Sequence, residues 1–182
     1  MKKNFVLFGL LAFVLSAQLF AADVKAGSVK APGKGKVILV GRVSLKKDFD
    51  FKARALALGY GEKAASTPVK YCIGDASVGT QAYELSEPFY YTVKVEKDGT
   101  VKLPYFHVVV AGYEYFRLPC AAKVTVPEGS SYVYVGNFEY DLDYALRVAG
   151  FKHYDEFDKA EEWINTATGK ECNLIRAEFE FE

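Results

Sequence analysis

The chain has few of the residues that carry metal, redox or nucleophilic chemistry. Its 182 residues include two histidines, three cysteines and one methionine, which is Met1. Copper(I) carriers use thioether and thiolate ligands, so without Met1 only the cysteines remain as soft donors. The sequence also has no C-x-x-C pair, no G-x-S-x-G elbow and no H-x-x-x-H spacing. We therefore expect no catalytic residues, no cofactor and no enzymatic activity.

The chain also lacks an excess of charge of either sign. Its 23 Lys and Arg residues balance 23 Asp and Glu residues, and loss of Lys2 and Lys3 with a signal peptide would leave 21 basic against 23 acidic residues. Nucleic-acid-binding domains have a clear basic excess, and anionic membranes attract clusters of lysine and arginine. The balance argues against a nucleic-acid partner and gives no reason to expect a membrane-surface partner.

Long apolar runs are absent except at the N-terminus. Lys2 and Lys3 precede FVLFGLLAFVL at 5–15, and a region of small residues ends at Ala22. This pattern is typical of a secretory signal peptide, and the run is shorter than the about 20 residues that cross a bilayer as a helix. We predict a signal peptide at 1–22, with an uncleaved membrane anchor as the alternative. The mature chain, without a transmembrane helix, would be exported to the periplasm or the cell surface of a bacterium.

The exported part is long enough for one domain. A cut after Ala22 removes 22 of the 182 residues and leaves 160, which is enough to bury one hydrophobic core. Residues 23–35 contain Lys, Gly, Ala and Pro with almost no large apolar side chain, which predicts a flexible leader. We assign residues 36–182 to a single domain.

Short β-branched and aromatic runs between turn signals predict a mostly β domain. Residues 36–45 predict a strand with Gly41 as a candidate bulge, and residues 69–74 predict a second strand. Residues 48–58 alternate like a strand, although their alanines favour a helix equally, and residues 59–68 predict a loop. Residues 173–182 alternate apolar and charged side chains, which predicts a half-buried last strand.

Two turn signals divide the middle of the chain. Asp98-Gly99 lies between alternating runs and predicts a hairpin, because such a turn needs positive φ. Pro104, in the second arm, has no backbone N–H to donate and predicts a sheet edge or a bulge. Pro127 to Gly129 predicts a turn between two further strands.

One helix is predicted near the C-terminus, between Asp155 as its N-cap and Gly169 as its stop. Its apolar stripe, which we expect to lie on a sheet, consists of Phe157, Ala160, Trp163, Ile164 and Ala167.

These elements together predict an antiparallel β-sandwich, immunoglobulin-like in general type, with one helix before the last strand. A small outer-membrane β-barrel is the alternative fold, although the strands carry charges without an apolar outer band.

Three acidic residues, Glu139, Asp141 and Asp143, are predicted to lie on one face of a strand. Calcium needs several oxygen ligands that converge on one point, whereas alternate residues of a strand place their carboxylates along a row. A solvated sheet face explains the acids better, with Lys94 or Lys123 as cross-strand partners. Whether the row binds a cation stays open at this stage.

The two histidines give the alternative hypothesis of a periplasmic metal-binding protein. His107 lies in an apolar run, and His153 lies just before the predicted helix. A site would need both rings to converge with a carboxylate such as Asp155, or with a thiolate. Because no ligand spacing supports this, we favour packed, hydrogen-bonded histidines.

The cysteines, Cys72, Cys120 and Cys172, are odd in number for an exported chain. One disulfide would leave one thiol over, and the spacing does not choose among the three pairings. The remaining thiol would be buried as a small apolar group or would form a bridge to another chain, and we favour burial.

Tyrosine and phenylalanine are abundant, with 13 and 14 residues, and they crowd the central strands. An aromatic core is the more ordinary explanation, and an outward aromatic patch is the functional one. Candidate binding aromatics are Tyr113, Tyr115, Tyr132 and Tyr134. We predict a non-enzymatic binding or structural module that uses sheet edges and exposed tyrosines to contact a protein or glycan partner in the cell envelope.

Overall fold

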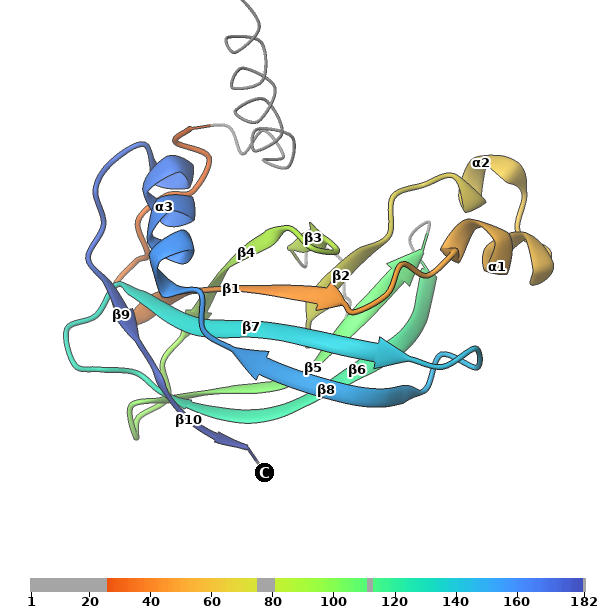
Figure 1. Ribbon diagram of the computed structural model, residues 1–182. Coiled ribbons are helices and arrows are strands. Elements are labelled where there is room, and N and C mark those ends of the chain that lie inside the picture. Colours follow the sequence, from red (N-terminus) through yellow and green to blue (C-terminus); the bar gives the residue numbers. More distant parts are fainter. Residues whose placement is uncertain (1–25, 75–80, 111–112, 182) are drawn as a thin grey trace, which may run out of the picture.

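Two β-sheets pack face to face in the computed structural model, which describes residues 26–74, 81–110 and 113–181 (Figure 1). For residue 110 and for residues 113–115 the description covers the backbone alone. The predicted β-sandwich is therefore confirmed, and the predicted signal peptide lies outside the described residues. Among the residues described, no helix has the length and the apolar character needed to cross a membrane.

The first sheet has the strand order β4-β1-β7-β8, with the short β9 also paired to β7. The bounds are Lys36–Leu45 for β1, Pro88–Lys94 for β4, Tyr132–Leu142 for β7, Val148–Tyr154 for β8 and Leu174–Arg176 for β9. Strand β7 runs parallel to β1 and β9, whereas the other pairs are antiparallel. The first sheet is therefore mixed, with the antiparallel pairs that were predicted and two parallel pairs beside them.

The second sheet is antiparallel throughout and has the order β10-β6-β5-β2-β3. Its bounds are Lys70–Ile73 for β2, Ala82–Glu84 for β3, Thr100–Val110 for β5, Tyr113–Thr125 for β6 and Glu178–Phe181 for β10. The predicted last strand is thus two strands in different sheets, because the chain crosses between them at Ala177. The N–H of Ala177 donates to the carbonyl of Tyr134 (3.0 Å) at this crossing.

The predicted hairpin at Asp98-Gly99 is wrong. A tight turn does form, with positive φ at Gly99 and its N–H donating to the carbonyl of Glu96 (3.1 Å). Its two arms are β4 and β5, however, and these belong to different sheets. Turn chemistry specifies a chain reversal, whereas the partner of each arm depends on which strand can complete its buried face.

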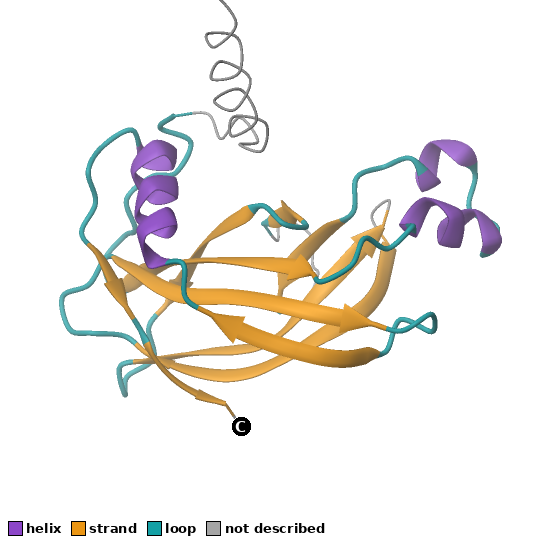
Figure 2. Ribbon diagram, viewed as in Figure 1, coloured by secondary structure: helices purple, strands orange, loops and turns teal. Residues whose placement is uncertain are grey.

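Helices lie at two ends of the sandwich (Figure 2). The ambiguous segment 48–58 forms α1 (Phe51–Ala57), where Asp50 accepts a hydrogen bond from the N–H of Ala53, and the predicted loop contains the short α2 (Glu62–Ala65). The helical alternative holds because a cap and alanine-rich composition favour it.

Helix α3 (Phe157–Thr168) confirms the predicted helix and its stop, because Gly169 adopts the left-handed conformation. Its buried Ala160, Ile164 and Ala167 cover the outer face of the first sheet, as the stripe predicts. The predicted flexible leader also packs here, since Val29 contacts this cluster and its N–H donates to the carbonyl of Ala167 (3.0 Å).

Aromatic side chains fill the space between the sheets, including the fully buried Tyr71, Phe89, Phe106, Phe138 and Tyr140. The register of β1 against β7 shifts at Gly41, but the extra residue is on β7, where Val135 and Gly136 lie opposite Gly41, so the bulge belongs to β7 and the predicted bulge at Gly41 is wrong. The register of β5 against β6 shifts at Pro104, which confirms that Pro104 lies at a bulge, with the extra residue on β6.

Candidate functional site

The acidic residues on β7 are paired with basic groups and do not converge. Asp141 forms a salt bridge with Lys46 (3.0 Å), and this hydrogen bond lowers the pKa of Asp141 and raises the pKa of Lys46. Glu139 lies opposite Lys152 of β8. The predicted partners differ, because Lys94 lies opposite Lys36 and Lys123 contacts Asp98. The row is a solvated sheet face whose charges are compensated.

Asp143 lies beyond the end of β7 and organises the turn that leads into β8. Its carboxylate accepts from the N–H groups of Ala145 (2.8 Å) and Arg147 (3.0 Å), and from the Arg147 guanidinium (2.8 Å). These contacts, led by the backbone hydrogen bond of Arg147, lower the pKa of Asp143. The carboxylate oxygens of Asp143 are therefore occupied by hydrogen bonds that stabilise the turn.

His107 is buried in β5, with only 1% of its surface exposed. Its neighbours Phe106 and Val108 belong to the core, so by alternation His107 lies on the outer face of the second sheet. Nε of Arg117 donates to its Nε2 (2.5 Å), and the two residues flank the ring of Tyr105. His107 therefore belongs to a packed polar–aromatic contact.

His153 lies on β8 of the other sheet and points toward the core. Its Nε2 donates to the carbonyl of Val135 (3.0 Å), and its ring packs against Phe138 and Phe179. Asp155 instead binds Arg176 (3.0 Å) and the N–H of Phe157 (2.7 Å). The trio of His107, His153 and Asp155 does not come together, and no three His, Cys, Asp or Glu side chains within the described part of the chain could hold one ion.

All three cysteines are free thiols buried in separate places. Burial raises the pKa of Cys72, and it raises the pKa of Cys120 to about 12. Cys172 follows α3 in the chain, and its Sγ lies 3.2 Å from the hydroxyl oxygen of Thr168. The three cysteines therefore form no disulfide, and all three thiols are buried, as was predicted for the remaining one.

Two of the predicted binding tyrosines, Tyr132 and Tyr134, are not available as a surface patch. Tyr132 and Tyr134 are 6% and 3% exposed, because α3 covers them. The side chains of Tyr113 and Tyr115 lie outside the described residues. An aromatic core thus explains the pair that is described.

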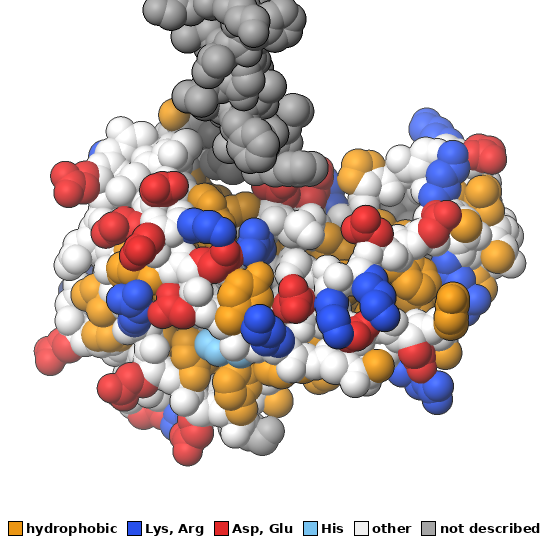
Figure 3. Space-filling model, in the orientation of Figure 1, with side chains coloured by type: hydrophobic (Ala, Val, Ile, Leu, Met, Phe, Trp, Pro, Cys, Tyr) orange, Lys and Arg blue, Asp and Glu red, His pale blue; other side chains and the backbone are white. Residues whose placement is uncertain are grey.

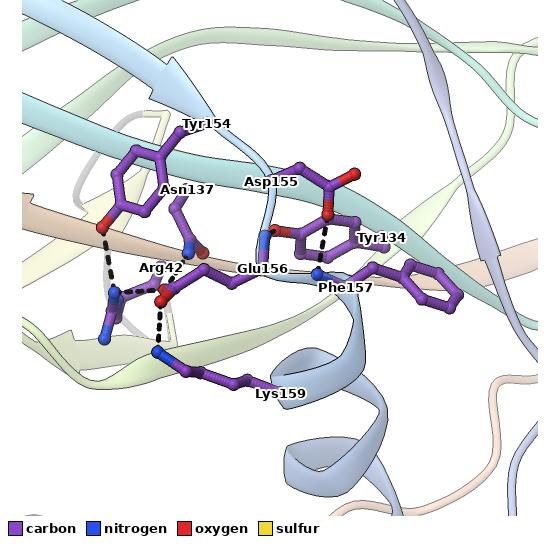
Figure 4. Close-up of polar contacts among 8 residues, drawn as sticks. All are labelled: Arg42, Tyr134, Asn137, Tyr154, Asp155, Glu156, Phe157 and Lys159. Carbon is purple, nitrogen blue, oxygen red and sulfur yellow. Dashed lines mark hydrogen bonds and ion pairs between the residues drawn. The ribbon is translucent and has the colours of Figure 1, made fainter.

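Polar side chains gather where β8 leads into α3 (Figure 4). The Glu156 carboxylate accepts from Arg42 (2.5 Å) and Asn137 (2.6 Å) and also from Lys159. Arg42 donates in addition to the hydroxyl of Tyr154 (2.9 Å). Because three donors occupy this carboxylate, the cluster secures the start of α3 on the sheet.

A further candidate is a hollow of about 730 Å³ between the β1–α1 connection and the β7–β8 turn. We call it the loop-end hollow; its lining includes Phe49, Leu142, Tyr144 and Ala149. Tyr144 is 97% exposed at the tip of the turn. Figure 3 shows apolar side chains at this end, over α1, where Leu56 and Leu58 are exposed.

Charged side chains of both signs surround the loop-end hollow. Asp48, Asp50, Lys47 and Arg54 line one side, and the paired Asp141 and Asp143 line the other. An apolar centre with a polar rim is the usual composition of a protein interface. The alternation of Glu139, Asp141 and Asp143 predicted a strand that continues past Leu142, whereas β7 ends there and Tyr144 lies in the turn that follows. Asp143 before a short segment is a recognisable turn signal.

No protein-family model, curated protein or solved structure matches the chain. The inference of function therefore starts from the geometry of the loop-end hollow.

Proposed function

We propose that the protein is a non-enzymatic binding module, exported to the bacterial cell envelope, that holds a protein partner at the loop-end hollow. The observation that carries this proposal is Tyr144, a large aromatic residue that is 97% exposed beside an apolar hollow. Tyrosine at an interface supplies a large contact area at a low cost in conformational entropy. The turn itself is organised by Asp143 and Arg147, so it does not need the Tyr144 ring.

The lining favours a protein segment that inserts an apolar or aromatic side chain. Phe49, Leu142 and Ala149 offer apolar contacts and no side-chain hydrogen bond, which suits a hydrophobic anchor better than a sugar. The mixed charges at the rim would pair with polar groups around that anchor. The proposal is non-enzymatic because the histidines and Glu156 are engaged in contacts within the fold.

The test is selection of peptides from a random library on the immobilised protein, followed by calorimetric titration of the selected peptides. We expect peptides with an apolar or aromatic anchor whose affinity falls about tenfold or more with Tyr144→Ala, as for an interface anchor. Tyr144→Phe should retain most of the affinity. Glu128→Ala, in the turn that precedes β7 at the other end of the sandwich, is the matched control and should bind like the wild type.

Affinity that is indifferent to Tyr144 would overturn the proposed site. A glycan array on the same variants separates the ligand classes. Binding to oligosaccharides that depends on Tyr144, without any peptide that does, would replace the protein partner with a glycan.

A further inference from the structure

Two strand edges lie together on one side of the sandwich. β8 is the last strand of the first sheet and β10 is the last strand of the second. Within the described residues neither strand has a second neighbour in its sheet. Figure 1 shows β8 and β10 on the same side, with the chain ending after β10. Such edges present unpaired backbone groups that can accept another strand.

Aromatic rings bridge the gap between these two edges. Phe151 contacts Phe181 (5.8 Å between ring centroids), and His153 contacts Phe179 (4.9 Å). The order of the contacts shows that β8 and β10 run antiparallel. Phe151 and Phe181 remain 44% and 45% exposed, so the cluster is covered on its inner side and open toward solvent.

The outward charges of the two edges have opposite sign. Phe151 and His153 point inward on β8, so by alternation Lys152 points outward. On β10, Phe179 and Phe181 face these rings, so Glu178 and Glu180 point outward. Lys152, Glu178 and Glu180 are all exposed. Lys152 lies opposite Glu139 in its own sheet, and Glu180 lies opposite Lys123. The outermost charge is therefore positive on the β8 edge and negative on the β10 edge.

We propose that this side of the sandwich binds a second copy of the chain, with β8 of each copy paired to β10 of the other. A two-fold axis parallel to the strands places the first sheet of one copy beside the second sheet of its partner. Rotation about this axis leaves the direction of every strand unchanged. Because β8 and β10 of one copy run antiparallel, β8 also runs antiparallel to the β10 of the partner. This single interface pairs β8 and β10 of both copies, so no edge strand on this side stays open, and each sheet continues into a sheet of the partner.

Side chains favour this pairing over the others. Lys152 faces the acidic residues of the partner's β10 on the outer surface, while Phe151 and Phe181 become buried inside. Pairing of β8 with β8 would oppose lysines, and pairing of β10 with β10 would oppose glutamates; like charges directly opposite destabilise a strand pair. Charges on an edge usually prevent association, but here they select one complementary arrangement.

The test is sedimentation equilibrium of the purified protein over a range of concentrations, combined with a charge exchange. We expect a dimer whose dissociation constant rises about tenfold in Lys152→Glu, and similarly in Glu178→Lys with Glu180→Lys, because each change affects two symmetric contacts. The variant with all three changes should return to within about twofold of the wild type. Lys94→Glu, on the opposite edge strand β4, is the matched control and should not weaken the dimer.

Melting curves of each variant separate a weakened contact from a damaged fold. A protein that is monomeric at all concentrations would overturn the proposal. So would a dimer that does not respond to the single exchanges, or one that the combined exchange fails to restore. This surface excludes Tyr144, so failure here leaves the loop-end proposal intact, and failure there leaves the dimer intact.

Discussion

The ring of His153 occupies the space that a side chain at position 136 would need. A Cβ built on Gly136 would overlap Nε2 of His153, and Gly136 also has a φ of +81°. The same His153 nitrogen donates to the carbonyl of Val135 (3.0 Å). The bulge of β7, the packing of β8 and the aromatic contacts to β10 therefore depend on one missing side chain.

Gly136→Ala should lower the free energy of unfolding by about 3 kcal/mol or more, because it adds an overlap in the core to the backbone strain of positive φ. Gly74→Ala is the matched control, since Gly74 has a φ of +71° and no atom of the described residues lies within 4 Å of a built Cβ. It should cost only about 1 kcal/mol. Urea denaturation measures both, and equal losses would show that His153 does not constrain position 136.

Glu156→Ala should lower the free energy of unfolding by about 2–3 kcal/mol, because it leaves the part-buried donors of Arg42 and Asn137 without their acceptor. Lys159→Ala is the control, since the Lys159 side chain is 61% exposed, and it should cost less than about 1 kcal/mol. Chemical denaturation compares them. A loss as small as that of the control would mean that the cluster does not secure α3.

The cysteines should be inert in the folded protein. A thiol-reactive chromogenic reagent at neutral pH should label none of the three in native conditions and all three in denaturant, because burial raises the pKa of Cys72 and Cys120 and encloses Cys172. Rapid labelling of one thiol in the native protein would contradict this. Fewer than three labelled thiols after denaturation without reductant would reveal a disulfide.

Acid should destabilise the protein through Asp141 and Asp143. Their pKa values are lowered in the folded state by Lys46 and Arg147, from an ordinary value of 3.8. A lowered folded pKa stabilises the protein above the unfolded pKa, and this contribution is lost as pH falls below it. The melting temperature should fall as the pH is lowered below about 4, and less steeply in Asp141→Asn. An unchanged slope in that variant would contradict the prediction.

Local signals predicted several elements, as the helix α3 and its stop at Gly169 show. A glycine stop and an apolar stripe with a 3.6-residue period act through nearby residues, so they can be read from the chain itself. The candidate site was not predicted, because the exposure of Tyr144 depends on where β7 ends. Alternation alone treats Tyr144 and the buried Tyr140 alike.

The sequence by itself determined the class of fold, the aromatic core and the position of α3, because periodicity and composition specify which faces must be buried. Only the tertiary structure decided the partners. It assigned the arms of the Asp98-Gly99 turn to different sheets, paired Asp141 with Lys46, and separated His107 from His153. These pairings depend on which distant segments bury one another's apolar faces. Local sequence patterns do not specify which of the possible strand partners is the most stable.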